Sequence, residues 1–366
     1  MTARENIRVA LIGYGYAGKT FHAPLIQSVP GLQLVGVGSS RPDRVLADLR
    51  GVTVCSAEGA ATHPDVDLVV IATPNDSHFP LASAALLAGK HVVVDKPFTV
   101  TLAEARALVA LAEKQERLLS VFHNRRWESE SLATKAILES GALGEVVHFE
   151  THIDRFRPVV RQRWRENTGP GAGLWFDLGP HLIDEALHLF GLPHTINASF
   201  GLLRAGGETE DWAHVQLNYD GLRVILHASL LVSGGIARTV IHGTRASWAK
   251  HDVDVQEKQL VAGMRPNEVG FGVDPNPGIL YDGATGEQTE IPAPVGNESA
   301  YYVGIREALL GRQANPVPPE QALAVMAVLE RSFESGAKEQ ALPLQLTERE
   351  GAAFKSRKRT APETKP

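Results

Sequence analysis

An aspartate and a histidine stand four positions apart near the middle of the chain, at Asp177 and His181, just after the stretch GPGAG. On a helix this spacing places both side chains on one face. An imidazole can accept a proton near neutral pH, and a carboxylate can orient it. The same spacing also occurs in ordinary helix-surface pairs and caps, so it does not by itself assign a reaction.

A second glycine pattern, Gly-x-Gly-x-x-Gly, ends the first apolar segment of the chain. After a strand and before a helix, such glycines allow a tight turn, close approach of a pyrophosphate and close helix packing. The N-terminus of the helix then offers free N–H groups to the anion. The sequence therefore predicts a dinucleotide site at Gly13, Gly15, Tyr16, Ala17 and Gly18.

The end of the second expected strand bears on which dinucleotide is bound. Sites for NAD usually carry a carboxylate there, which accepts hydrogen bonds from the ribose hydroxyls. This chain instead has Ser39, Ser40 and Arg41, and two hydroxyls with a guanidinium suit a 2′-phosphate. We therefore expect NADP, while Asp43 keeps NAD possible and Arg41 is also compatible with an ordinary solvated charge.

Two domains are expected from the pattern of elements. Up to residue 123, short apolar runs alternate with helical patterns, which predicts a doubly wound parallel sheet of the Rossmann type. The expected strands are 7–13, 32–38, 52–55, 67–73, 91–97 and 118–123, and the expected helices are 20–28, 42–49, 79–88 and 101–116, the last opened by a Thr101–Glu104 capping box.

The rest of the chain predicts an α+β domain with a large, mostly antiparallel open sheet. A helix at 128–140, a strand at 145–153 and the helix after the glycine loop precede successive strands from residue 195, with a hairpin turn at Asp220-Gly221. Residues 263–298 are expected to be loops, followed by helices at 298–311 and 318–338. The predicted domains are 1–123 and 124–345, with a flexible tail at 346–366.

Composition narrows the class of partner. The chain has 366 residues, a net charge of −6 and a pI of about 6.2, which argues against nucleic acid or an anionic membrane surface. Cys55 is the sole cysteine, and no apolar run reaches the length of a membrane span. We expect a cytoplasmic protein with a small-molecule partner and neither a nucleic-acid nor a membrane partner.

Three further stretches carry a resemblance to a known family. With TPNDSH (73–78), AGKHVVVDKP (88–97) and the Asp177/His181 loop, nearly the whole chain resembles the Gfo/Idh/MocA oxidoreductases. It is most similar to the subgroup of NADP-dependent scyllo-inositol dehydrogenases. The family usually has Glu-Lys-Pro where this chain has Asp95-Lys96-Pro97, and Pro170 and Ala172 interrupt its glycine loop.

The resemblance implies a catalytic centre of Lys96, Asp177 and His181, contributed by both domains. His181 would accept the hydroxyl proton, Asp177 would orient it, and the ammonium of Lys96 would bond the same oxygen; Lys96 and His181 can also exchange these roles. The implied reaction is hydride transfer between nicotinamide and a secondary alcohol or ketone of a cyclic polyol or sugar, scyllo-inositol first. An NAD-dependent glycosidase and a non-catalytic nucleotide-sensing regulator are the alternatives on this fold.

Further site residues follow from the same resemblance. The remaining cofactor-binding residues are expected to be Thr73, Pro74, Asn75, His78, Asp95, Lys96, Trp164 and Arg165, and the substrate-binding residues Lys96, Asn124, Asp154, Asp177 and His181. No metal is expected, because Asp177, His181, Glu185 and His188 lie along one helix and do not converge from several directions. An open antiparallel sheet needs a cover, so we expect a homodimer or homotetramer formed through the C-terminal sheet.

Overall fold

A computed structural model describes residues 6–251 and 254–354, which form two compact units. Unit 1 comprises residues 1–128, 254–273 and 295–326, and unit 2 comprises 129–253, 274–294 and 327–366. Both units are discontinuous, because two later segments of the chain belong with the N-terminal sheet. The predicted boundary at residue 123 separates the strands of the first sheet from those of the second, and residue 345 lies just after the last strand. Both boundaries stay a prediction.

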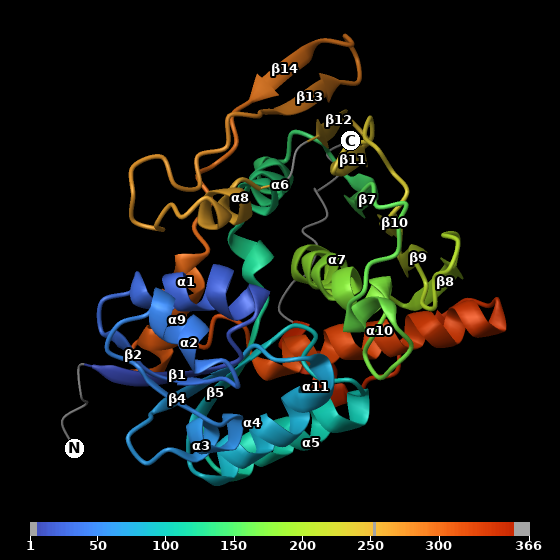
Figure 1. Ribbon diagram of the computed structural model, residues 1–366. Coiled ribbons are helices and arrows are strands. Elements are labelled where there is room, and N and C mark those ends of the chain that lie inside the picture. The colour runs from blue at the N-terminus through green and yellow to red at the C-terminus, as the bar shows by residue number, and fades with distance from the viewer. Residues whose placement is uncertain (1–5, 252–253, 355–366) are drawn as a thin grey trace. The chain divides into compact units, whose positions relative to one another are not determined.

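Unit 1 is built on a six-stranded parallel sheet in the order β3-β2-β1-β4-β5-β6, which confirms the predicted Rossmann fold. The central strands are apolar and buried on both faces, as a sheet covered twice requires. Helices α3, α4 and α5 lie on one face, and α1, α2 and α9 on the other (Figure 1). The strands are β1 (Ile7–Ile12), β2 (Leu32–Gly38), β3 (Thr53–Cys55), β4 (Leu68–Ile71), β5 (His91–Asp95) and β6 (Leu119–Phe122).

The helices of unit 1 follow the predicted capping and periodicity. The Thr101 hydroxyl accepts the Glu104 N–H at 3.2 Å and the Glu104 carboxylate accepts the Thr101 N–H at 3.1 Å, which confirms the capping box. Helix α3 was not expected from the sequence, since it is short and alanine-rich. The helices are η1 (Gly18–His22), α1 (Ala23–Gln27), α2 (Pro42–Asp48), α3 (Ala57–Thr62), η2 (Asn75–Ser77), α4 (His78–Leu87), α5 (Leu102–Lys114), η3 (Asn124–Trp127), α8 (Gln256–Val261) and α9 (Ser299–Leu309).

Unit 2 is built on a nine-stranded sheet in the order β14-β13-β12-β11-β7-β10-β9-β8-β15, and among the described strands only the neighbours β7 and β10 pair in parallel. The predicted mostly antiparallel sheet is therefore confirmed. Tyr219 pairs with Leu222 across the predicted turn, where Gly221 has a φ of +66°. The strands are β7 (Val146–Asp154), β8 (Thr195–Gly201), β9 (Trp212–Tyr219), β10 (Leu222–Ser229), β11 (Thr239–Gly243), β12 (Ala246–Lys250), β13 (Gly278–Asp282), β14 (Gln288–Ile291) and β15 (Leu342–Pro343).

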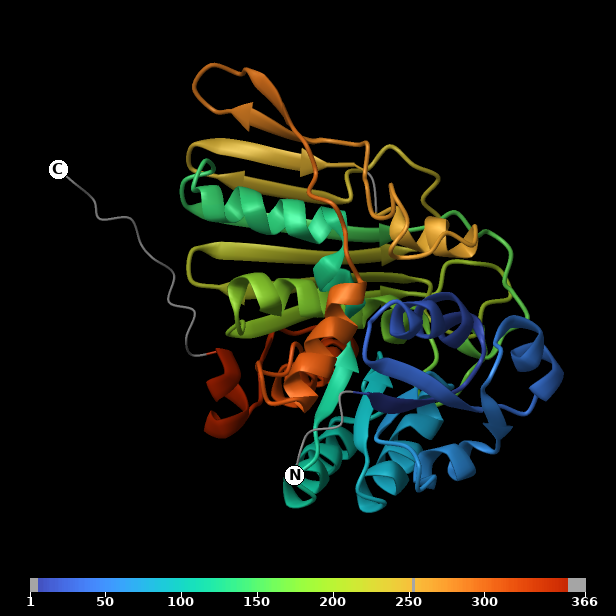
Figure 2. The same ribbon diagram turned by 90° about the vertical axis from the view of Figure 1, so that its left-hand side faces the viewer.

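The two faces of this sheet differ. On β7, Phe149, Thr151 and Ile153 are buried beneath α7, while the alternate residues are half-buried on the opposite face, which we call the outer face. Figure 2 shows α6 and α7 against the inner face of the strands. The helices here are α6 (Ser129–Ser140), η4 (Trp164–Glu166), α7 (Leu174–Phe190), α11 (Glu348–Gly351) and η5 (Ala352–Phe354), and α10 (Pro319–Lys338) runs from unit 1 into unit 2.

Strands β13 and β14 correct the expectation that residues 263–298 are all loops. They form an antiparallel hairpin at the sheet edge, where Gly278 pairs with Ile291. Their residues are largely half-buried or exposed, so the stretch lacks the alternation that reveals a strand. The tail expected from residue 346 begins with α11, capped by Thr347 and Glu350, and residues 355–366 lie outside the described part.

Among residues 6–251 and 254–354, no helix combines the length and the apolar character needed to cross a bilayer.

Candidate active site

Of the three glycines after β1, Gly13 and Gly18 are closely packed against other atoms, and Gly15 borders open space. A Cβ on Gly13, whose φ is +94°, would lie 2.3 Å from the Ala72 carbonyl oxygen, and a Cβ on Gly18 would lie 2.0 Å from the Gly13 oxygen. A Cβ on Gly15 would meet nothing within 4 Å. Gly13 and Gly18 therefore serve the turn and the helix packing, while the space at Gly15 suits the close approach of a phosphate.

This turn lies where the strand order of the sheet reverses. Strand β1 has β2 on one side and β4 on the other, and open α/β sheets bind ligands outside the carboxyl ends of the strands at this switch point. A π-helical segment, η1, follows the turn, and such segments are frequent at functional sites. Tyr16 is exposed here, and its hydroxyl donates to Glu257 at 2.6 Å. The turn thus has the geometry of a dinucleotide site.

The end of β2 presents hydroxyl and guanidinium groups. The Ser39 hydroxyl accepts the backbone N–H of Arg41 at 3.1 Å and so shapes the turn into α2. Ser40 and Arg41 are exposed, and Asp43 follows in the first turn of α2. Ser39 is occupied in part by this backbone bond, whereas Ser40 and Arg41 present an exposed hydroxyl and guanidinium at the end of the strand.

His78 connects the two loops that carry Thr73 and Lys96. Its imidazole is fully buried, and its ring nitrogens lie 2.9 Å from the Pro97 carbonyl oxygen and 3.0 Å from that of Thr73. Burial lowers the pKa of His78, while the charge of Asp95 and the bonds to the two carbonyl oxygens act in the opposite direction. Asn75 is also buried at this place. We infer that His78 acts by holding these loops together at the carboxyl edge of the sheet.

Asp95 anchors the lysine that follows it. Its carboxylate accepts the backbone N–H of Lys96 at 2.8 Å and lies 3.8 Å from Nε2 of the buried His22, whose Nδ1 is 2.6 Å from the Tyr302 hydroxyl. Burial by itself would raise the pKa of Asp95, but the nearby His22 and the charge of Lys96 lower it. Sequence reasoning missed His22 and Tyr302. Lys96 is half-buried at the carboxyl end of β5, and the Lys96–Pro97 peptide is cis.

In unit 2, the position of Glu210 explains why the second glycine loop has a glycine at position 173. The Glu210 carboxylate accepts the backbone N–H of Trp175 at 3.0 Å and the Glu210 carbonyl accepts that of Leu174 at 3.2 Å, so Glu210 caps helix α7. Burial raises the pKa of Glu210. Gly173 has a φ of +101°, and a Cβ there would lie 2.2 Å from the Glu210 carboxylate. Gly173 is therefore required for the cap, which the sequence did not reveal.

Asp177 and His181 stand on α7 itself, as the four-residue spacing predicts. The Asp177 carboxylate lies 3.4 Å from Nε of Arg165, whose guanidinium stacks over the Trp164 ring at 4.5 Å. His181 is buried, with 8% of its surface exposed. The structure thus brings Asp177, Arg165 and Trp164 together within unit 2, whereas Lys96 belongs to unit 1.

The segment that carries Trp164 and Arg165 is fixed by buried ion pairs. Arg204 bonds Glu166 at 3.2 Å and Asp211 at 2.9 Å, and Arg163 bonds Glu166 at 2.7 Å. Since Arg204, Asp211 and Glu166 are all buried, the loss of one partner would leave an uncompensated charge. These pairs hold η4 in unit 2 beside the β8–β9 connection.

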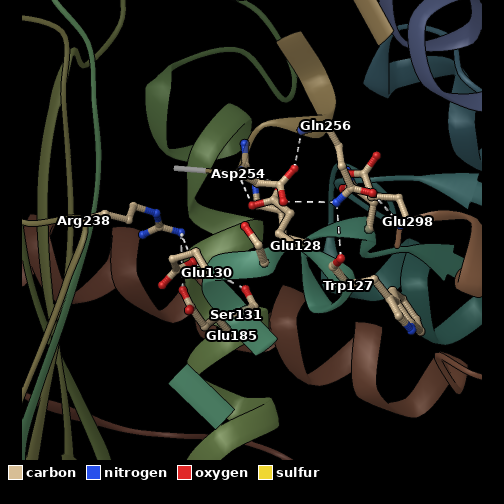
Figure 3. Close-up of polar contacts among 12 residues, drawn as sticks. Trp127, Glu128, Glu130, Ser131, Glu185, Arg238, Asp254, Gln256 and Glu298 are labelled. Atoms are coloured by element: carbon tan, nitrogen blue, oxygen red, sulfur yellow. Dashed lines mark hydrogen bonds and ion pairs between the residues drawn. The ribbon is translucent and has the colours of Figure 1, made fainter. Parts of the chain in front are cut away.

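Asn124, expected to bind substrate, is buried in unit 1 and donates to Glu298 at 2.5 Å. Burial and the neighbouring Glu128 and Asp254 raise the pKa of Glu298. Gln256 donates to Asp254 at 3.1 Å and to the Trp127 carbonyl (Figure 3). This network gives Asn124 a structural role, and its substrate role stays a prediction.

Glu185 also has a structural role. Its carboxylate accepts from Thr151 at 3.1 Å and lies 3.5 Å from Arg238, which also pairs with Glu130 at 3.6 Å (Figure 3). These bonds tie α6 and α7 to the inner face of the sheet.

Asp154, like Asn124 an expected substrate residue, lies at the end of β7 and pairs with His152 at 3.2 Å.

Two stretches of the chain match models of one oxidoreductase family. Residues 7–123 match its NAD-binding Rossmann fold, and residues 135–346 match its C-terminal alpha/beta domain. The chain belongs to the Gfo/Idh/MocA family and is an oxidoreductase, as the sequence motifs predicted.

Similar proteins include an uncharacterized oxidoreductase, YdgJ of Escherichia coli, which is 52% identical over 90% of this chain and 96% of its own. IolW of Bacillus subtilis, a scyllo-inositol 2-dehydrogenase (NADP(+)), is 34% identical over 93% and 97%. A solved putative oxidoreductase from Klebsiella pneumoniae has 52% identity and a TM-score of 0.90 over 96% of this chain and 98% of that one.

Proposed function

We propose that the protein is an NADP-dependent oxidoreductase that transfers a hydride between nicotinamide and a secondary alcohol or ketone of a cyclic polyol or sugar, with scyllo-inositol and its ketone as first choice. The observation that carries the proposal is the open glycine turn at a Rossmann switch point, with a lysine at the carboxyl edge of the same sheet. The name of the Bacillus relative supports the substrate class.

The residues of unit 1 fit a dinucleotide. The pyrophosphate would lie against the turn at Gly15, and Ser40 with Arg41 would hold a 2′-phosphate. Thr73, Asn75 and Lys96 lie in loops after β4 and β5, and His78 positions those loops. The bound nicotinamide would supply the hydride acceptor or donor.

Side chains of the protein, and not the cofactor, would transfer the proton. We propose that His181 takes the hydroxyl proton while the Lys96 ammonium donates a hydrogen bond to the same oxygen and favours its deprotonated form. Asp177, four residues before His181 on α7, would orient the imidazole and also fix Arg165. In the reductive direction the same groups would return the proton to the carbonyl oxygen.

The test is a panel of inositol stereoisomers, aldoses and keto-sugars, each offered with NADP and with NAD and read by nicotinamide absorbance. We expect turnover with cyclic polyols and a preference for NADP. Nucleotide binding without turnover of any substrate would favour a sensing regulator. Release of a glycoside leaving group without net change in nicotinamide absorbance would favour a glycosidase.

We also propose that the outer face of the unit 2 sheet pairs with a second copy, giving a homodimer or homotetramer. The helices cover the inner face (Figure 2). The outer face carries the half-buried Gln216 and also Ile225, which is 9% exposed. Light scattering should report a dimer or tetramer, and Ile225→Lys should shift it towards monomer. An unchanged assembly would remove this face as the interface.

A further inference from the structure

A histidine-rich cluster lies on the outer face of the unit 2 sheet, away from Asp177 and His181 on the inner-face helix. Strands β7 and β10 are parallel neighbours, and His152 is the register partner of His227. Asp154 stands two residues after His152, so its side chain shares the same face. The two paired strands therefore fix three potential ligands on a rigid framework.

The donor atoms of this trio are close enough to share one ion. His152 Nδ1 lies 3.2 Å from the Asp154 carboxylate, and His227 Nε2 lies 3.9 Å from its other oxygen. One donor atom from each residue can be chosen so that all lie within 4.8 Å of one another. Ligands of tetrahedral zinc, bound at about 2.0–2.1 Å, are roughly 3.3 Å apart, so modest side-chain rotations would close the set.

The neighbouring residues supply the outer hydrogen bonds that metal-bound histidines require. His152 Nε2 lies 2.9 Å from Glu150, which would accept its N–H while Nδ1 bound an ion. His227 Nδ1 lies 3.4 Å from Nδ1 of His214, the cross-strand partner on β9. Trp212 stacks on His214 and would hold that ring in place. Each ligand histidine thus has a candidate orienting partner.

We propose that His152, Asp154 and His227 form a binding site for one divalent transition-metal ion of the zinc type. Two imidazoles and a carboxylate suit zinc, cobalt or nickel better than magnesium or calcium, which prefer oxygen ligands. The trio leaves a fourth position for water or another group. The side chains of the three residues are each 12% exposed in the single chain, so an ion can enter before the outer face pairs with a second copy. This proposal departs from the expectation of no metal, which rested on the α7 residues and on the lack of a Cys cluster or a second His pair with ligand spacing in the sequence.

Cobalt(II) is the probe, because its visible spectrum reports coordination directly. The full-length protein is stripped with a chelator, dialysed and titrated with cobalt chloride while absorbance and calorimetry are followed. We expect one ion per chain with the intense bands of a four-coordinate nitrogen and oxygen site, displaced by zinc. The readout does not depend on turnover.

Variants locate the ion. His227→Gln and Asp154→Asn should each weaken binding by at least about a hundredfold, and Glu150→Gln by about ten- to a hundredfold through loss of an orienting bond. His242→Gln is the matched control, since His242 lies on the neighbouring strand β11 but outside the trio. Circular dichroism confirms folding, and Asp154→Asn decides the case if His227→Gln does not fold.

Each outcome decides the proposal. Stoichiometric binding that is lost in the trio variants and kept in His242→Gln supports it. Absence of stoichiometric binding would mean that the residues form only a hydrogen-bonded histidine–carboxylate cluster, and the proposal would fall. Binding that survives His227→Gln and Asp154→Asn, or that His242→Gln abolishes, would place the ion elsewhere and refute it equally.

Discussion

Gly173→Ala should destabilise unit 2, because Glu210 occupies the place of the missing side chain. The φ of +101° and ψ of +165° at Gly173 fall in a region used almost only by glycine, which costs another residue about 1–3 kcal/mol. The new Cβ would also displace the Glu210 carboxylate from the Trp175 N–H, and a lost helix cap costs about 1 kcal/mol. We expect a loss of about 3 kcal/mol in the free energy of unfolding.

Urea unfolding followed by tryptophan fluorescence measures this loss where it occurs, since Trp164, Trp175, Trp212 and Trp248 lie in unit 2 and only Trp127 in unit 1. Gly169→Ala is the matched control from the same loop. Its Cβ would meet nothing within 4 Å and its φ is not positive, so we expect a change within about 0.5 kcal/mol.

A double-mutant cycle with Glu210→Ala separates steric conflict from backbone strain. If the clash is real, Gly173→Ala should cost about 1–2 kcal/mol less when Glu210 is already truncated. Equal costs in both backgrounds, or a Gly173→Ala protein as stable as Gly169→Ala, would refute the role assigned to Glu210.

Three further predictions concern charge and chemistry. Burial lowers the pKa of His91 to about 4, so as pH falls from about 6.5 to 4 the unfolded chain takes up a proton first. The free energy of unfolding of the wild type should then fall by up to about 3 kcal/mol relative to that of His91→Asn, whose amide oxygen can still accept the Leu118 N–H. Equal pH slopes of the two proteins in urea unfolding would contradict this. Arg41→Ser should lower kcat/KM with NADP by about ten- to a hundredfold and leave NAD kinetics unchanged, while Arg44→Ser should change neither. Lys96→Met and His181→Ala should each lower kcat by about 10²- to 10⁴-fold with little effect on cofactor binding, and retained turnover would exclude the proposed roles.

The sequence alone determined the features that depend on residues close together in the chain. Six apolar runs gave the parallel sheet, because strands buried on both faces must be apolar nearly throughout. The Thr101–Glu104 capping box was readable because its partners are three residues apart. The Asp177/His181 pair lies on one helix for the same local reason, and the glycine pattern after β1 marked the dinucleotide turn.

Only the tertiary structure decided what distant segments do to one another. Glu210 caps α7 across 35 residues, and no local signal marks a glutamate for that role. His152 and His227 become neighbours only through the pairing of β7 with β10. The sequence predicts His78 as a cofactor contact, and only the fold shows that its ring also lies between the carbonyl oxygens of Thr73 and Pro97. Side-chain roles that depend on long-range backbone pairing have no periodicity, so they must be read from the fold.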